Sequence, residues 1–115
     1  MRVQRWMQAP VEQMNELTGR QVVHGVNLTM ARLILKKGAV VPRHHHVNEQ
    51  ITTLLEGRLL FEFPEGPQEL LAGESLVIPP DLPHRVEALE DSVAIDVFAP
   101  VREDWLRGDD AYLRR

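Results

Sequence analysis

The sequence predicts an all-β domain that forms an antiparallel sandwich or barrel. Three observations favour this class. Short segments rich in apolar and branched residues recur along the chain, Gly and Pro residues separate these segments, and little helical periodicity is present before residue 100. With 115 residues, the chain is expected to form one domain, residues 1–115, that buries roughly two-thirds of its unfolded surface.

The composition narrows the functions that this domain can have. Hydrophobic residues make up 43% and charged residues 26%, as in ordinary soluble globular proteins. The net charge is −4 and the basic residues are scattered, apart from Arg114 and Arg115, so no nucleic-acid partner is expected. No segment approaches the roughly 18 apolar residues of a membrane helix, so no membrane partner is expected and a cytoplasmic location is predicted.

The chain contains no cysteine. Disulfides, zinc fingers, iron–sulfur clusters and thiol nucleophiles are therefore excluded. Any metal site must use nitrogen and oxygen ligands, which makes the five histidines the first candidates.

The first 35 residues are expected to lead into the strands. Residues 1–9 alternate loosely between apolar and polar side chains and could form an edge strand or an arm that reaches a neighbouring molecule. Residues 10–17 place apolar side chains at three-residue spacing, which permits a short helical turn, with an ordered loop as the alternative. Strands are then predicted from Gln21 and over residues 27–35, because both stretches are rich in branched and apolar residues.

The second half of the chain continues the strand pattern. Gly57 lies between two apolar segments, residues 51–55 and 59–63, and this arrangement predicts a β-hairpin. Branched residues resume between later turns and predict short strands at residues 70–71, 75–78, 84–88 and 92–98. The last fifteen residues look helical and are expected to pack back on the barrel through Trp105, Leu106, Tyr112 and Leu113.

The stretch GAVVPRHHHVNEQITTLLEG, at the centre of the sequence, holds most of the candidate metal ligands. Side chains of an extended strand alternate between its two faces, so His44, His46 and Gln50 share one face. His45 and Glu49 share the other face, and Glu49 would replace Gln50 only if a bulge turned it inwards. Two imidazoles two residues apart, followed by a polar donor, form a partial metal site that needs one more ligand from another strand.

His84 is the best candidate for that missing ligand. It directly follows the proline-rich turn of residues 79–83, which fixes the start of the next strand at little cost in unfolded-state entropy. His24 is expected to be an ordinary surface or packing histidine. His45 is expected to point away from the site, because it lies on the opposite face.

These residues resemble the two sequence motifs of the cupins, a family of small β-barrels. The first family motif is G-x5-H-x-H-x3,4-E-x6-G, and the chain has glutamine where the glutamate is usual. Its matching residues are Gly38, His44, His46, Gln50 and Gly57. The second family motif is G-x5-P-x-G-x2-H-x3-N, and the chain has aspartate for the second glycine and alanine for the asparagine. Its matching residues are Gly73, Pro79, Asp81, His84 and Ala88.

The resemblance implies a jelly-roll barrel that holds a divalent transition metal through His44, His46, Gln50 and His84. Imidazole suits Ni, Zn, Fe and Cu alike, and an amide oxygen tolerates Mn, so the pattern does not choose among these metals. Because the four ligands carry no charge, the bound ion would be a strong Lewis acid towards an anionic ligand. The alternative is that these polar residues only line the mouth of the barrel.

The last predicted strand contains a second group of candidate residues. Alternation puts Asp96 and Phe98 on one face and an apolar row that includes Ile95 and Val97 on the other. In one interpretation the apolar row is the core, so Asp96 and Phe98 lie outside and Arg102 is a surface charge. In the other, both faces are covered, one by the barrel interior and one by a second subunit. The strand pattern alone favours neither.

Four segments resemble the KdgF-type cupins, namely NEQITTLLEG, IPPDLPH, EDS followed by DVF-x-P-x-R, and the tail DWL. Proteins of this type are associated with opening 4,5-unsaturated monouronates, which are products of pectin and alginate breakdown, to linear keto sugars. The resemblance implies a small anionic sugar-like substrate and puts Asp96, Phe98 and Arg102 beside the metal. Asp96 would then act as general acid and base, Arg102 would bind the substrate carboxylate, and Phe98 would form an apolar wall.

Three other functions stay open. A cupin with three histidines could hold redox-active iron and act as a dioxygenase, and a polyketide-cyclase role also suits such a site. The barrel could instead bind a sugar or metabolite without catalysis. A homodimer is expected in each case, because small cupins commonly dimerise and the apolar row of the last strand offers a surface for a second copy.

Overall fold

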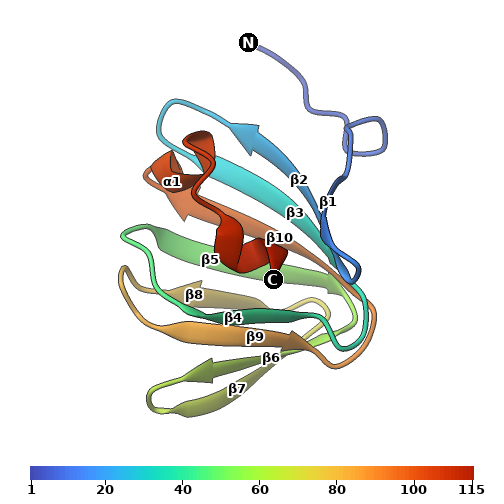
Figure 1. Cartoon of the computed structure of the whole chain (residues 1–115), viewed down its shortest axis with the longest axis vertical. Coiled ribbons are helices and arrows are strands. Elements are labelled where there is room, and N and C mark those ends of the chain that lie inside the picture. Colours follow the sequence, from blue (N-terminus) through green and yellow to red (C-terminus); the bar gives the residue numbers. More distant parts are fainter.

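The computed structural model describes residues 1–115 and consists mainly of strands in two antiparallel sheets, followed by two short helical segments (Figure 1). The strands are β1 (Glu12–Asn15), β2 (Thr18–His24), β3 (Thr29–Leu35), β4 (Val40–His44), β5 (Glu49–Glu56), β6 (Arg58–Phe63), β7 (Gly66–Leu71), β8 (Ser75–Ile78), β9 (His84–Ala88) and β10 (Ser92–Ala99). The helical segments are α1 (Glu103–Leu106) and the 3-10 helix η1 (Ala111–Arg114). The predicted all-β jelly roll with a short C-terminal helical segment is confirmed.

The two sheets face each other as the walls of a barrel. The larger sheet has the order β1-β2-β3-β10-β5-β8 and the smaller one has the order β4-β9-β6-β7. Figure 1 shows that β5 and β10, which are distant in sequence, run side by side. The chain therefore passes repeatedly from one sheet to the other, and the ends of β4 and β9 meet at one end of the barrel, where His44 pairs with His84.

The apolar core fills the space between the sheets. Along β10 every second residue is buried, including Ala94 and Phe98, because alternate side chains of a strand point to the same face. The smaller sheet contributes Leu59 and Phe61, each 1% exposed, from the same alternation. The inward face of each strand thus determines both what packs in the core and which polar side chains enter the barrel.

The N-terminal elements differ from the sequence prediction. Residues 10–17 form neither a helical turn nor a plain loop, because Glu12–Asn15 is an edge strand paired with β2. Met14 is 5% exposed and joins the core, and the Asn15 side-chain oxygen accepts a hydrogen bond from the Leu17 N–H at 2.9 Å, which stabilises the turn into β2. Residues 1–9 form no strand; the Gln21 side chain donates to the carbonyls of Trp6 and Ala9 and holds this segment on the barrel.

The predicted hairpin around Gly57 is wrong. β5 pairs with β10 and β8, whereas β6 pairs with β7 and β9, so the chain crosses from one sheet to the other at Gly57. Both edges of β5 are already occupied, which leaves no edge for β6. Gly57 has φ +91°, and a Cβ atom there would overlap the Asp91 carbonyl and the Ser92 side chain and lie 2.7 Å from the Ser92 Cα.

Gly57→Ala is expected to lower the free energy of unfolding by about 2–4 kcal/mol, because it adds a steric overlap with backbone to the cost of a left-handed alanine. Gly73→Ala is the matched control, since Gly73 has φ +90° and a Cβ atom added there would meet nothing within 4 Å. It should cost only about 1–2 kcal/mol. Urea unfolding measures the free energy of unfolding of both variants. Equal losses would contradict the claim that the close backbone contact at Gly57 excludes a Cβ atom.

The C-terminal segment packs back on the barrel, as predicted, with one exception. Trp105 and Leu113 are buried and Tyr112 is half-buried, but Leu106 is 56% exposed and does not join the core. The helix α1 has a single turn, so its side chains cannot all face the barrel. The segment η1 packs against β4 and β1, and Figure 1 shows the C-terminus lying back over the strands.

The outer face of the larger sheet is apolar along β10. Val93, Ile95 and Val97 lie on this face and are half-buried, and Val97 pairs with the exposed residues Met30 and Ile51. The apolar surface that was predicted for contact with a second subunit is therefore present. The homodimer itself stays a prediction, which sedimentation of the purified protein would check. Neither helical segment is long and apolar enough to cross a membrane.

Candidate metal centre

Three histidines converge inside the barrel. His44 is the last residue of β4 and His84 is the first residue of β9, and the two face each other in the strand register. His46 lies in the connection between β4 and β5. One ring nitrogen from each histidine lies within 4.8 Å of the others, which is compact enough for all three to bind one metal ion.

The central stretch is not one strand, so the predicted shared face arises in a different way. β4 ends at His44 in the smaller sheet and β5 begins at Glu49 in the larger one. The alternation nevertheless continues through the connection, because His46, Asn48 and Gln50 are buried while His45 and Glu49 are exposed. Glu49 therefore does not replace Gln50.

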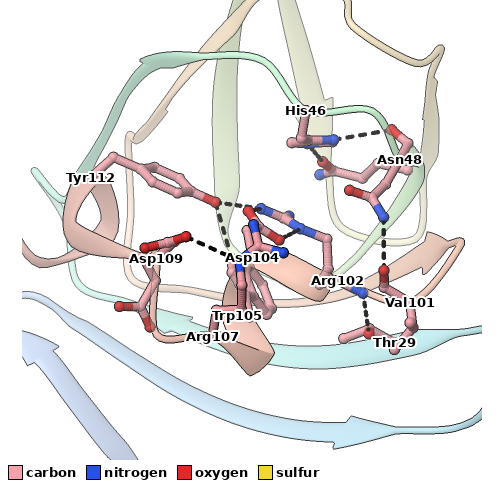
Figure 2. A network of polar contacts seen from close by, with 12 residues as sticks. Thr29, His46, Asn48, Val101, Arg102, Asp104, Trp105, Arg107, Asp109 and Tyr112 are labelled. Carbon is pink, nitrogen blue, oxygen red and sulfur yellow. Dashed lines mark hydrogen bonds and ion pairs between the residues drawn. The ribbon is translucent and has the colours of Figure 1, made fainter.

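Asn48 anchors this connection and was not identified from the sequence. Its side-chain nitrogen donates to the carbonyl of Pro100 at 2.6 Å and to that of Val101 at 3.3 Å, and Figure 2 shows the bond to Val101. Both bonds tie the connection to the segment directly after β10. These bonds fix the approach of His46 to the other two imidazoles. Simple continuation of the alternation from His44 and His46 to Asn48 would have found it.

Each histidine has the tautomer that metal binding requires. The Nδ1 atoms of His44, His46 and His84 lie 2.8, 3.0 and 2.8 Å from the carbonyls of Pro42, Asn48 and Leu82. A carbonyl oxygen only accepts, so each Nδ1 carries the proton and each Nε2 keeps its lone pair. Such hydrogen bonds also orient metal-binding imidazoles in known sites.

The three imidazoles are held neutral. Burial lowers the pKa of His44 to about 3 and the pKa of His46 to about 4, and it also lowers the pKa of His84. The positive charge of Arg102 lowers all three pKa values further. Protons therefore do not compete with a metal ion for these nitrogens near neutral pH.

Gln50 lies beside the histidine cluster, and its hydrogen bonds direct its side-chain oxygen towards His46. Its side-chain Nε2 donates to the Thr52 hydroxyl at 2.8 Å, and that hydroxyl donates to the Asp96 carboxylate at 2.6 Å. This chain directs the Gln50 Oε1 atom towards the His46 Nε2 atom, 3.0 Å away. With the proton of His46 on Nδ1, two lone pairs face each other, and a metal ion between them would satisfy both.

Asp96 faces the barrel interior. It is 5% exposed and lies on the same face of β10 as Ala94 and Phe98, so the interpretation that put it outside the barrel is wrong. Burial raises the pKa of Asp96 to about 6, although the Thr52 hydrogen bond and the charge of Arg102 oppose this rise. A carboxyl group with a pKa near neutrality can both accept and donate a proton.

Arg102 is a buried residue and not a surface charge. It is 1% exposed, and its guanidinium carbon lies 4.6 Å from the centre of the Phe98 ring and 4.3 Å from that of Trp105. Its Nε and Nη2 atoms donate to the two carboxylate oxygens of Asp104 at 2.9 and 2.7 Å, and Nη2 also donates to the Tyr112 hydroxyl at 2.7 Å. The sequence indicated neither Asp104 nor Tyr112 as a partner.

The two groups of candidate residues share one cavity of about 40 Å³. Its lining includes His44, Gln50, His84, Asp96, Phe98 and Arg102. Thr52 also lines it and was missed in the sequence, although it follows Gln50 at the same two-residue spacing. Tyr112 covers the cavity from the C-terminal segment, with its ring stacked 4.6 Å from that of His44.

The two remaining histidines lie outside this cavity, as predicted. The His45 side chain is 65% exposed and lies 3.7 Å from the Asp81 carboxylate. The His24 Nδ1 atom contacts the Thr29 hydroxyl at 2.8 Å, at the end of β2.

The fold and the site define a small β-barrel with an internal cluster of histidines suited to metal binding. Residues 31–98 match the cupin domain family. This match covers more than half of the chain, so the chain belongs to the cupins.

Two solved cupins are similar over almost their whole length. An RmlC-like cupin from Shewanella frigidimarina NCIMB 400 has 25% sequence identity and a TM-score of 0.84, covering 91% of this chain and 96% of that one. KdgF from Halomonas sp. has 27% identity and a TM-score of 0.82, covering 88% of this chain and 96% of that one. These values support the predicted resemblance to KdgF-type cupins.

Two further relatives are similar over part of their length. Oxalate decarboxylase from Bacillus subtilis, a protein with Mn(II) centres, shares the fold with 19% identity and a TM-score of 0.75, and the match covers 84% of this chain and 29% of that one. An uncharacterised protein from Methanocaldococcus jannaschii is 33% identical over 73 residues, which are 63% of this chain and 58% of that protein. The match thus spans little more than half of this curated relative.

Proposed function

We propose that this cupin is a metal-dependent enzyme that converts 4,5-unsaturated monouronates, the products of pectin and alginate breakdown, to linear keto sugars. The observation that carries this proposal is the buried chain of hydrogen bonds from Asp96 through Thr52 to Gln50. It connects a carboxyl group whose pKa lies near 6 to the histidine cluster, within one cavity that also contains Arg102. The likeness to KdgF from Halomonas sp. supports the choice of substrate.

The donor set fits a divalent transition metal. His44, His46 and His84 would supply Nε2 atoms and Gln50 would supply its side-chain oxygen, a set that Ni, Zn, Mn, Fe and Cu can each accept. When bound by these uncharged ligands, the ion supplies Lewis acidity towards an anionic substrate.

The protein side chains have separate roles in this proposal. The Arg102 guanidinium binds the substrate carboxylate, because its planar N–H groups match the two carboxylate oxygens. The Asp96 carboxylate accepts the proton of the anomeric hydroxyl as the bond between C1 and the ring oxygen breaks. It then returns this proton to C4 of the resulting enolate, whose oxygen becomes the ketone, so the reaction is an isomerisation with no net change in atoms. Phe98 forms an apolar wall for the sugar.

The direct test is an absorbance assay for loss of the conjugated double bond. Protein prepared without added metal is first analysed for its elements, then stripped and reloaded separately with Ni, Zn, Mn, Fe or Cu. We expect the unsaturated monouronate of galacturonate to lose its absorbance with at least one loaded form and not with the stripped form. Metal binding without loss of absorbance in any loaded form would contradict the proposal, and oxygen consumption that follows iron content would favour a dioxygenase instead.

A further inference from the structure

One of the two edges with which the Arg102 guanidinium can bind a carboxylate, the edge formed by Nε and Nη2, is already occupied by a carboxylate of the same chain. Asp104 accepts from both Nε and Nη2, which is the bidentate geometry that arginine forms with carboxylate ligands (Figure 2). The Nη2 atom also donates to the Tyr112 hydroxyl. A carboxylate ligand can therefore reach this edge only by replacing Asp104.

Arg102 does not need Asp104 to stay in place. Its guanidinium packs against the rings of both Phe98 and Trp105, and its backbone N–H donates to the Thr29 hydroxyl at 2.9 Å. These contacts hold the side chain and the backbone of Arg102 independently of Asp104. Asp104 does not position Arg102 but neutralises its charge. A guanidinium that is only 1% exposed is costly to leave without a negative partner.

The cavity beside the histidine cluster is too small for a monosaccharide. Its volume of about 40 Å³ has room for only a few waters, at ~10–15 Å³ for each water position. Beside it lies an open groove of about 310 Å³ whose lining includes His46, Asn48, Glu103, Asp104 and Arg107. Arg102 lines the cavity and Asp104 lines the groove, so their ion pair lies between the two, and the Asp104 side chain is 28% exposed.

We propose that Asp104 is a specificity-determining residue, an internal carboxylate that competes with the substrate carboxylate for Arg102 and separates the groove from the cavity. This inference rests on the proposed function in one respect, the role of Arg102 in carboxylate binding. An anionic sugar that enters from the groove replaces Asp104 and keeps the buried guanidinium paired. A neutral sugar cannot do so, because displacement of Asp104 would leave the Arg102 charge without a partner.

The test compares the binding of two saturated sugars, galacturonate and galactose, to the zinc-loaded protein by calorimetry. Asp104→Asn keeps the shape of the side chain but removes the competing charge, so we expect galacturonate to bind about tenfold more tightly, with no gain for galactose. Asp109→Asn is the matched control, because Asp109 pairs with Arg107 at the same two-residue spacing but on the surface. It should leave both affinities unchanged.

A second measurement does not depend on the folding of the variant. In zinc-loaded wild-type protein labelled with ¹³C, titration with galacturonate should shift the carboxyl resonance of Asp104 and leave that of Asp109 in place. Unchanged or weaker galacturonate binding in a folded Asp104→Asn variant, or a constant Asp104 resonance at saturating galacturonate, would overturn the inference. Turnover of unsaturated uronates is scored separately, so the proposed function can hold when this inference fails.

Discussion

Asp96→Asn should lower the turnover of an unsaturated monouronate by about 10²- to 10⁴-fold, the usual contribution of a general acid and base. Asparagine still accepts the hydrogen bond from the Thr52 hydroxyl, so the orientation of Gln50 and the bound metal should be retained. Only the proton transfer is removed. Elemental analysis and the absorbance assay, performed on the same loaded preparation, measure both expectations.

Thr52→Val provides a graded control for this substitution. It leaves the Asp96 carboxyl in place but removes both hydrogen bonds of the Thr52 hydroxyl, the one from Gln50 and the one that lowers the pKa of Asp96, so its metal content is measured alongside turnover. The pKa of Asp96 should therefore rise, and the acidic limb of the pH–rate profile should move to higher pH with a smaller loss of activity than in Asp96→Asn. Full activity of Asp96→Asn with a normal metal content would remove Asp96 from the mechanism.

Asp96→Asn should also make the metal-free protein more stable at neutral pH. The carboxyl ionises at its ordinary pKa of 3.8 in the unfolded chain and at about 6 in the folded one. The folded state therefore binds the extra proton between these values, and wild-type stability falls as pH rises through this window, by about 3 kcal/mol in total. The variant lacks this ionisation. The free energies of unfolding of the two proteins should therefore diverge between pH 4 and pH 6 and stay different above pH 6.

The second large effect is expected from His84→Ala. Loss of a residue that only orients a metal ligand typically costs 10- to 100-fold in affinity, so loss of an imidazole ligand should cost at least about 100-fold. Metal content should fall from roughly one ion per chain to a trace, and turnover should disappear with it. Elemental analysis after dialysis, followed by the absorbance assay, provides the measurement.

His45→Ala is the matched control for this experiment. His45 lies between two of the candidate ligands in sequence, but its side chain is 65% exposed and outside the cavity. We expect it to retain its metal, which is the quantity compared between the two variants. Equal metal content in the two variants would show that His84 is not a ligand, whatever the effect on turnover.

Much of the candidate site could be predicted from local rules. Strand alternation placed His44, His46 and Gln50 on one side and Glu49 on the other, and the structure keeps this division although the stretch is not one strand. The same rule, applied to neighbouring positions, would have added Asn48. Alternation is a property of adjacent residues, so it survives the passage of the chain from one sheet to the other.

Strand pairing could not be predicted in the same way. The apolar segments around Gly57 look like a hairpin, yet β5 already has β10 and β8 as neighbours and β6 lies in the other sheet. Which strands become neighbours depends on contacts between distant parts of the chain, and a turn residue between two apolar segments does not reveal them. The same long-range packing decided that Asp96 faces inwards.

The sequence by itself determined the class of fold, the family motifs and the residues able to bind a metal, because these depend on composition, spacing and alternation. Only the tertiary structure decided that Arg102 is buried, that its Nε and Nη2 atoms pair with Asp104, and that Tyr112 stacks on His44. These contacts join the C-terminal segment to strands far away in sequence. They result from the way the segment packs on the closed barrel, which no local pattern encodes.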